Sequence, residues 1–127
     1  MENPLYQEII KNYIKAYNDF DVDGMLQNMD SQVKFENISN GQTTLITNGI
    51  DELKKQAEQA RHYFKKRMQK IMNFKISHDQ AVIEVSYMAI LAIDLPNGPK
   101  AGDKIELKGK SIFKFKDNKI IELKDIS

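Results

Sequence analysis

The segment from Lys104 to Lys116, KIELKGKSIFKFK, alternates between two kinds of side chain. Its even-numbered positions are mostly charged, and most of these charged residues are lysines. The odd-numbered positions are apolar or small: Ile105, Leu107, Gly109, Ser111, Phe113 and Phe115. A period of two places successive side chains on opposite faces of a β-strand. The segment therefore predicts a long strand with one covered face and one wetter face.

Similar strands are predicted on both sides of this segment. Ala81 to Leu95 has apolar or aromatic residues at most of its odd positions, and Met68 to Ser77 and Lys119 to Ile126 also have β character. Turns are expected at His78-Asp79, at Pro96-Asn97-Gly98 and at Asp117-Asn118. These segments predict four long strands joined as consecutive hairpins.

The first half of the chain has helical spacing. Asn3-Pro4 is a helix-start signal, and apolar residues then recur every three or four positions as far as Phe20. Asp21 is expected to start a second, shorter helix, which Asp30-Ser31 closes. Asp51 to Phe64 predicts a third helix, with apolar residues again at helical steps.

A predicted hairpin lies between the second and third helices. Residues from Val33 onward alternate, Asn40-Gly41 favours a tight turn, and Thr43 to Thr47 supplies the returning strand. Helices followed by consecutive hairpins indicate an α+β domain with the helices on one face of a mainly antiparallel sheet. At 127 residues the chain suits one domain spanning 1–127.

Charge and composition exclude several kinds of site. Nineteen basic and 18 acidic residues give a formal charge of +1, which argues against nucleic acid or an anionic membrane as a partner. The regular lysines of residues 104–116 are typical of a solvated sheet face. Without Cys and with only two His, the chain offers no thiol nucleophile or Cys-based metal centre, and we expect no cofactor. No secretory signal is recognisable, so a cytoplasmic location is expected.

An acidic segment partly matches a calcium-binding loop. Asp19, Asp21, Asp23 and Gly24 have the required spacing, but Asp30 replaces the bidentate Glu and an alternating strand follows in place of a helix. Asp21 is also accounted for as a helix cap. We therefore expect no metal site here.

Several motifs together resemble the nuclear transport factor 2-like superfamily and, within it, the SnoaL-like bacterial proteins. They are YIKAYNDFDVDGML at 13–26, VKFEN at 33–37, LPNGPKAGD at 95–103, FKFKDNKI at 113–120 and ELKDIS at 122–127. The resemblance implies a cone-shaped, cystatin-like fold in which three N-terminal helices pack in a strongly curved sheet. It also implies an apolar pocket at the open end and a homodimer formed through the outer sheet face.

The resemblance allows two kinds of enzyme to be compared with this chain. Tyr13 is similar in position to the tyrosine that donates to the oxyanion in ketosteroid isomerases, but Asn37 and Ser111 stand where the base and second acid would be. Steroid-type isomerisation is therefore not expected. The segment FENI is similar to a strand of limonene-type epoxide hydrolases, although Phe35 replaces their tyrosine and only the late acid, Asp125, is present.

Asp125 is the most informative residue of the sequence. It shares the expected apolar face of Ile121 and Leu123, and a desolvated carboxyl can act as a general acid or base near neutral pH. The alternatives are a strand end that has reached water, or a buried acid satisfied by Tyr13 or Ser111. Tyr13 itself is equally compatible with an ordinary buried aromatic residue.

These residues predict a pocket for an apolar or aromatic organic molecule. The catalytic candidates are Asp125, which would move a proton, and Tyr13 and Asn37, which would hold a carbonyl oxygen or water. The candidates for lining the pocket, all of which also suit a plain core, are Tyr17, Phe35, Tyr63, Tyr87, Ser111 and Phe113. His62 and His78 are expected at the surface. An isomerase, cyclase or dehydratase and a non-catalytic, dimeric binding or interaction domain both remain open.

Overall fold

The computed structural model describes residues 4–96 and 98–127. Its elements in chain order are α1 (Pro4–Asn18), α2 (Val22–Leu26), β1 (Met29–Ser39), β2 (Gln42–Asn48), α3 (Ile50–Ala60), a 3-10 turn η1 (Arg61–Tyr63), β3 (Phe64–Ser77), β4 (Gln80–Leu91), β5 (Lys104–Lys116) and β6 (Lys119–Ile126). The predicted helix start at Asn3 and the middle of the predicted turn at Asn97 lie outside the described residues.

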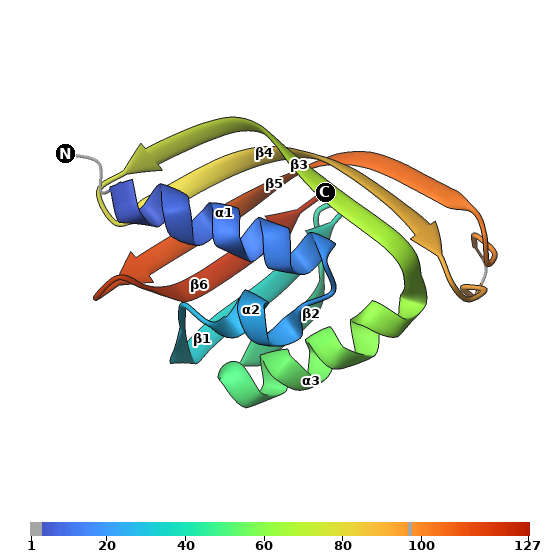
Figure 1. Cartoon of the computed structure of the whole chain (residues 1–127), viewed down its shortest axis with the longest axis horizontal. Helices are drawn as coiled ribbons and strands as arrows, with labels where there is room; N and C mark the ends of the chain where they lie inside the picture. Colours follow the sequence, from blue (N-terminus) through green and yellow to red (C-terminus); the bar gives the residue numbers. More distant parts are fainter. Residues whose placement is uncertain (1–3, 97) are drawn as a thin grey trace.

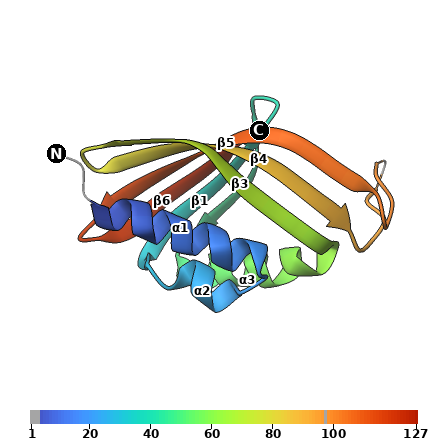
Figure 2. The ribbon, with the colours of Figure 1, turned by 45° about the horizontal axis from the view of Figure 1, so that its top comes forward.

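The six strands form one mixed sheet in the order β2-β1-β6-β5-β4-β3. All neighbouring pairs are antiparallel except β1 and β6, which are parallel. The sheet curves around the helices, which all lie on its concave side (Figures 1 and 2). This arrangement confirms the predicted α+β class and the cone of helices within a curved sheet.

The turn signals of the sequence have the expected backbone geometry. Asn40 and Gly41 have φ values of 53° and 77°, and His78, Asp117 and Asn118 also have positive φ. Asn, Asp and Gly tolerate this left-handed region better than most residues, which is why they mark the tight turns.

Several predicted boundaries were wrong. The second helix ends at Leu26, and Asp30-Ser31, which were expected to close it, already belong to β1. The third helix ends at Ala60, and Phe64 already belongs to β3, which starts four residues before Met68. β4 ends at Leu91, and the next four residues, as far as Leu95, lie outside the sheet. The early start of β3 matters for function, since it places Arg67 on the concave face, where the side chain is buried.

A bulge changes the face assignment on β6. The pairing of β5 with β6 shifts register between Lys114 and Phe115, so Ile120 and Leu123 are both buried while Ile121 is not. Asp125 keeps the face of Leu123, as predicted, but Ile121 does not share it.

The core lies between α1 and the concave sheet. Tyr6 stacks on Phe115 with ring centroids 3.9 Å apart, and Tyr13 meets the edge of Phe113 at 5.7 Å. At the end of α1, the Asn18 amide accepts from the Gln69 backbone N–H at 2.7 Å and donates to the Gln69 carbonyl at 3.1 Å. These two hydrogen bonds fix the last residue of α1 against β3.

The acidic segment after α1 is held by ordinary side-chain contacts. The Asp21 carboxylate accepts from the Gly24 N–H at 3.0 Å and caps α2, as predicted, while Asp19 pairs with Lys15 and Asp23 with Lys54. Across residues 4–96 and 98–127, no three His, Asp or Glu side chains gather in a way that could hold a metal ion.

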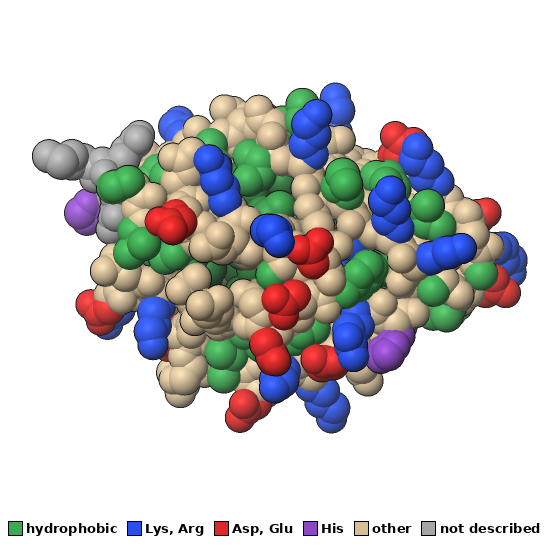
Figure 3. All heavy atoms as spheres, in the orientation of Figure 1, with side chains coloured by type: hydrophobic (Ala, Val, Ile, Leu, Met, Phe, Trp, Pro, Cys, Tyr) green, Lys and Arg blue, Asp and Glu red, His purple; other side chains and the backbone are tan. Residues whose placement is uncertain are grey.

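Both histidines are exposed, as expected, and charges of both signs are mixed over the helical face (Figure 3). Within the described part of the chain, no helix combines the length and apolarity needed to cross a bilayer.

Candidate functional site

Two cavities lie along the concave face of the sheet. The larger has a volume of about 440 Å³, and α1, α2, β1, β2, α3, β3 and β6 contribute to its wall. Six of the predicted site residues line it: Tyr13, Tyr17, Phe35, Asn37, Tyr63 and Asp125. The smaller has a volume of about 210 Å³, and the predicted residues in its wall are Tyr17, Asn37, Tyr87, Ser111 and Asp125. Tyr17, Asn37 and Asp125 therefore face both cavities.

Asp125 combines a desolvated carboxyl with a single hydrogen bond. The Ser111 hydroxyl on the neighbouring strand β5 donates to Asp125 Oδ1 at 2.7 Å, because the two residues are direct partners in the β5 and β6 pairing. Burial raises the pKa of Asp125 to about 6, and the Ser111 hydrogen bond opposes this rise. The carboxyl therefore exchanges a proton near neutral pH, which suits general acid or base chemistry.

Tyr13 places an unpaired phenol in the larger cavity. Its residue is only 6% exposed, and no hydrogen bond joins its hydroxyl to another residue in the described ranges. Burial raises its pKa well above the ordinary value, Asp125 raises it further, and Arg67 lowers it. The group therefore stays protonated at neutral pH and is available as a hydrogen-bond donor to a bound oxygen.

A hydrogen-bonded pair of tyrosines lies in the wall of the smaller cavity. The Tyr17 hydroxyl donates to the Tyr87 hydroxyl at 3.0 Å, and burial raises the pKa of both groups. Tyr17 comes from α1 and Tyr87 from β4, so this hydrogen bond crosses from helix to sheet. Tyr17 lines both cavities, and Tyr87 lines the smaller one.

Asn37 has fewer hydrogen-bonding groups available for a ligand than the sequence indicated. Its Nδ2 donates to Thr44 Oγ1 at 2.8 Å across the β1 and β2 hairpin, and the Thr44 hydroxyl also lies 3.3 Å from the Asn37 carbonyl. One amide N–H and the amide oxygen remain for a ligand. Asn37 is the direct β1 partner of Asp125 on β6, which brings the two candidates together.

Phe113, predicted to contact the ligand, is a core residue. It is fully buried, lines neither cavity and packs against Tyr13 and Phe115. The alternation on β5 placed it correctly on the concave face, but α1 covers this part of the sheet. Its role is to support Tyr13 from behind.

Sequence reasoning missed the charged basic residue of the site, Arg67, together with several of the residues that complete the cavity wall. Its side chain is 3% exposed and lies in the wall of the larger cavity. Arg67 Nε donates to the Tyr17 carbonyl at 2.8 Å, and the guanidinium lies 3.8 Å from the centroid of the Tyr17 ring. Arg67 is flanked by two lysines and a methionine, so the local sequence gives no sign that its side chain is buried. The only available signal was that Arg67 lies two residues before Gln69, on the same face of a strand.

The site can therefore hold an oxygen atom and move a proton. Asp125 supplies an exchangeable proton, Tyr13 supplies a neutral donor, and Arg67 supplies a fixed positive charge. The two histidines lie outside this arrangement. Because the carboxyl, the phenol and the guanidinium line one cavity, a single organic ligand can contact all three.

Comparisons with known proteins agree with this architecture. Residues 10–123 match the SnoaL-like domain family. No curated protein sequence matches this chain.

Solved structures similar to this chain include three that are informative. A candidate polyketide cyclase from Xanthomonas campestris has a TM-score of 0.82 at 16% identity, covering 98% of this chain and 90% of its own. A nuclear transport factor 2-like protein of unknown function from Burkholderia pseudomallei has a TM-score of 0.77 at 14% identity, covering 95% and 88%. TerC, co-crystallised with polyporic acid, has a TM-score of 0.74 at 16% identity, covering 96% and 90%.

At these identities the solved structures establish the fold, whereas the family match rests on the sequence itself. The match covers most of the chain, from the middle of α1 to β6. The fold is that of nuclear transport factor 2-like proteins, and the chain belongs to the SnoaL-like domain family.

Proposed function

We propose that this protein binds an apolar or aromatic organic molecule in the larger cavity and that Asp125 transfers a proton to or from it. The observation that carries the proposal is the desolvated Asp125 carboxyl, with a pKa of about 6, in the wall of a cavity that also contains the unpaired Tyr13 phenol. The reaction would be of the isomerase, cyclase or dehydratase type, in which a proton leaves a carbon next to a carbonyl.

The chemistry follows from the two side chains. Ionised Asp125 removes a proton from the carbon next to the ligand carbonyl, and the electron pair of the broken C–H bond moves to the carbonyl oxygen as an enolate. The Tyr13 hydroxyl donates a hydrogen bond to that oxygen, which stabilises the developing charge. Protonated Asp125 then returns the proton to carbon or oxygen. The remaining N–H of Asn37 supplies a second donor to the ligand.

The lining of the cavity supports an aromatic ligand. Tyr17, Phe35 and Tyr63 contribute rings, and Met25 contributes a flexible thioether. The likeness to TerC, co-crystallised with polyporic acid, and to a candidate polyketide cyclase favours the same ligand class.

A non-catalytic binding domain is the competing function. In that case Asp125 and Ser111 would only satisfy each other, as their 2.7 Å hydrogen bond allows. Binding and proton transfer therefore have to be measured separately.

Binding is tested by a thermal-shift screen of lipophilic carbonyl and phenolic compounds, with polyporic acid included. Wild type and Asp125→Asn are compared, because the variant retains an oxygen that can accept from Ser111. We expect stabilisation of both forms by the same aromatic compounds. If no compound stabilises either form, the proposed cavity function is wrong.

Proton transfer is tested without knowledge of the product. 2-Tetralone, an aromatic ketone with acidic C–H groups, is incubated with the protein in D₂O and its deuterium uptake is followed by NMR. Wild type should accelerate uptake at least tenfold over Asp125→Asn, while an exposed-carboxylate control, Asp79→Asn, should match wild type. Binding of 2-tetralone without accelerated uptake would favour the non-catalytic domain.

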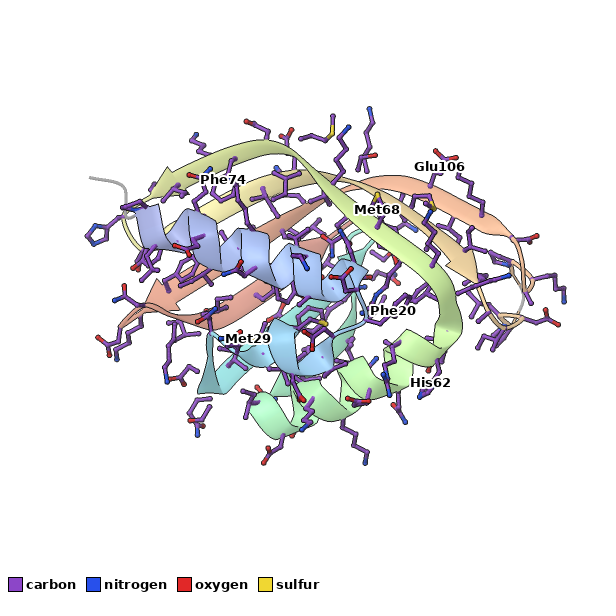
Figure 4. All side chains as sticks on the ribbon, viewed as in Figure 1. Phe20, Met29, His62, Met68, Phe74 and Glu106 are labelled. Atoms are coloured by element: carbon purple, nitrogen blue, oxygen red, sulfur yellow. The ribbon has the colours of Figure 1, made fainter. Side chains whose placement is uncertain are left out.

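A homodimer formed through the outer sheet face is also part of the proposal. Met68 and Met72 on β3 are 44% and 63% exposed, and Met68 is shown in Figure 4. Met68 lies between Arg67 and Gln69, which both face the interior, so it points to the outer side. Light scattering should give twice the mass of the chain, and Met68→Lys should shift the mass toward that of one chain. The cytoplasmic location stays a prediction of the sequence.

A further inference from the structure

Arg67 is a buried cation that has no anionic partner within residues 4–96 and 98–127. Its Nε donates to the Tyr17 carbonyl at 2.8 Å, and one Nη lies 3.8 Å from the Met25 sulfur. The guanidinium stacks over two rings, at 3.8 Å from the Tyr17 centroid and 4.6 Å from that of Phe20, which lies between α1 and α2 (Figure 4). Among the described residues, no carboxylate forms an ion pair with it.

This arrangement is unusual for an arginine that is 3% exposed. A guanidinium stays charged at any physiological pH, and a buried charge is normally paired with an opposite charge. The Tyr17 carbonyl belongs to the last turn of α1, whose negative dipole end offsets part of the cost, and the rings offset another part. The Tyr17 carbonyl accepts from Nε and the Met25 sulfur from Nη2. The third nitrogen, Nη1, has no hydrogen-bond acceptor among the described residues.

The acid in the same cavity does not neutralise Arg67. Asp125 and Arg67 both line the larger cavity, but Asp125 is bonded to Ser111. Tyr13 lies within the field of both groups, since Asp125 raises its pKa and Arg67 lowers it. The cavity therefore contains a separate positive end.

We infer that the ligand carries an anionic oxygen, as a carboxylate or an ionised phenol or enol, which binds the free Nη1 edge of Arg67. This inference rests on the proposed function and narrows its ligand class from apolar or aromatic molecules to aromatic acids. The rings of Tyr17 and Phe20 hold the plane of the guanidinium, so the group is oriented before the ligand arrives. The aromatic body of the ligand then lies toward Tyr13 and Asp125.

A purely structural role for Arg67 makes a different prediction. As a cap of α1 it needs only Nε and the stacked rings, so replacing it would change stability without changing how the cavity discriminates between charged and neutral ligands. The charge preference of binding separates the two roles.

The test uses 2-naphthoate and 2-naphthamide, which have nearly the same shape and differ in charge, and measures both affinities by titration calorimetry at pH 8. Wild type should bind the acid at least tenfold more tightly than the amide. Arg67→Gln should lower this ratio to near one while leaving the amide affinity within about threefold. The matched control is Lys66→Gln, which removes the same charge from the exposed neighbouring position and should keep the wild-type ratio.

Each result decides the inference. An acid-to-amide ratio near one in wild type overturns it even if Arg67→Gln does not fold, and so does a ratio that survives in Arg67→Gln. If that variant unfolds, Arg67→Lys replaces it, and its ratio should fall severalfold because the ammonium lacks the planar fork. Failure of the cavity function looks different, because then neither compound binds wild type.

Discussion

Replacing Asp125 by asparagine should stabilise the protein, and only at pH values where the carboxyl is ionised. Burial raises the pKa of Asp125 from 3.8 to about 6, so the folded protein holds this proton more tightly than the unfolded chain does. The stability associated with the protonated form is fully present below about pH 3.8 and is lost as the pH rises through about 6. Asparagine is neutral at every pH and avoids this loss.

The magnitude follows from the two pKa values. Their difference corresponds to about 3 kcal/mol of free energy of unfolding, at about 1.4 kcal/mol for each tenfold change in proton affinity. Asp125 is half-buried, and contact with water in the cavity reduces this figure to about 2 kcal/mol. The Ser111 hydroxyl can still donate to the asparagine oxygen, so the substitution leaves no new unpaired donor on β5.

Urea denaturation at pH 4, 6 and 8 measures the effect. The free energy of unfolding of Asp125→Asn should exceed that of wild type by about 2 kcal/mol at pH 8 and by less than about 1 kcal/mol at pH 4. Any part of the difference that is the same at every pH is subtracted first. The control Asp79→Asn changes an exposed turn carboxylate and should stay within about 0.5 kcal/mol of wild type throughout. A stability difference for Asp125→Asn that does not change with pH would refute the reasoning, because the carboxyl would then not be desolvated.

Three further substitutions test the neighbouring contacts. Ser111→Ala removes the donor that opposes the effect of burial, so the pKa of Asp125 should rise above about 6 in a carboxyl NMR titration; an unchanged or lower pKa would contradict the 2.7 Å hydrogen bond. Asn18→Ala deletes both hydrogen bonds between α1 and the β3 backbone and should cost about 2 kcal/mol in urea denaturation, whereas a loss below about 0.5 kcal/mol would show that they contribute little. Tyr17→Phe removes the hydroxyl that donates to Tyr87 and should cost about 1 kcal/mol in urea denaturation; an unchanged stability would mean that this hydrogen bond contributes nothing to the fold.

Most of the fold could be predicted from the sequence because its strands alternate regularly. The strands Lys104–Lys116 and Lys119–Ile126 have the predicted bounds, since polar and apolar residues alternate along them and Asp117-Asn118 marks the turn. The start of β3 could not be predicted in this way. Tyr63 and Phe64 continue the apolar spacing of α3, so the change from helix to strand has no signature in the local pattern.

The site was predictable where a polar residue interrupts an apolar face, and not where charge suggested exposure. Asp125 stood out because it follows Leu123 on a covered face, and the structure places it in the cavity wall. Arg67 did not, because its burial depends on Tyr17 and Phe20, which lie far from it in the chain. Hydropathy assigns any arginine to the surface, and only the tertiary contacts show that this one is enclosed.

The polar groups of the cavity distinguish a ligand site from a core in which all polar groups are hydrogen-bonded to one another. In the described residues the one fully buried side-chain polar atom without a partner is Thr47 Oγ1, so the unpaired atoms of Tyr13 and Arg67 open onto the cavity, where a ligand can reach them. Asp125 has Ser111, but the Tyr13 phenol has no hydrogen bond and Arg67 has no counter-ion among the described residues. The unpaired donor and the unpaired cation both lack the same thing, an acceptor oxygen with negative charge. In the proposed function an aromatic acid or enolate would supply this oxygen to both groups, which is why we place ligand binding ahead of a purely structural role.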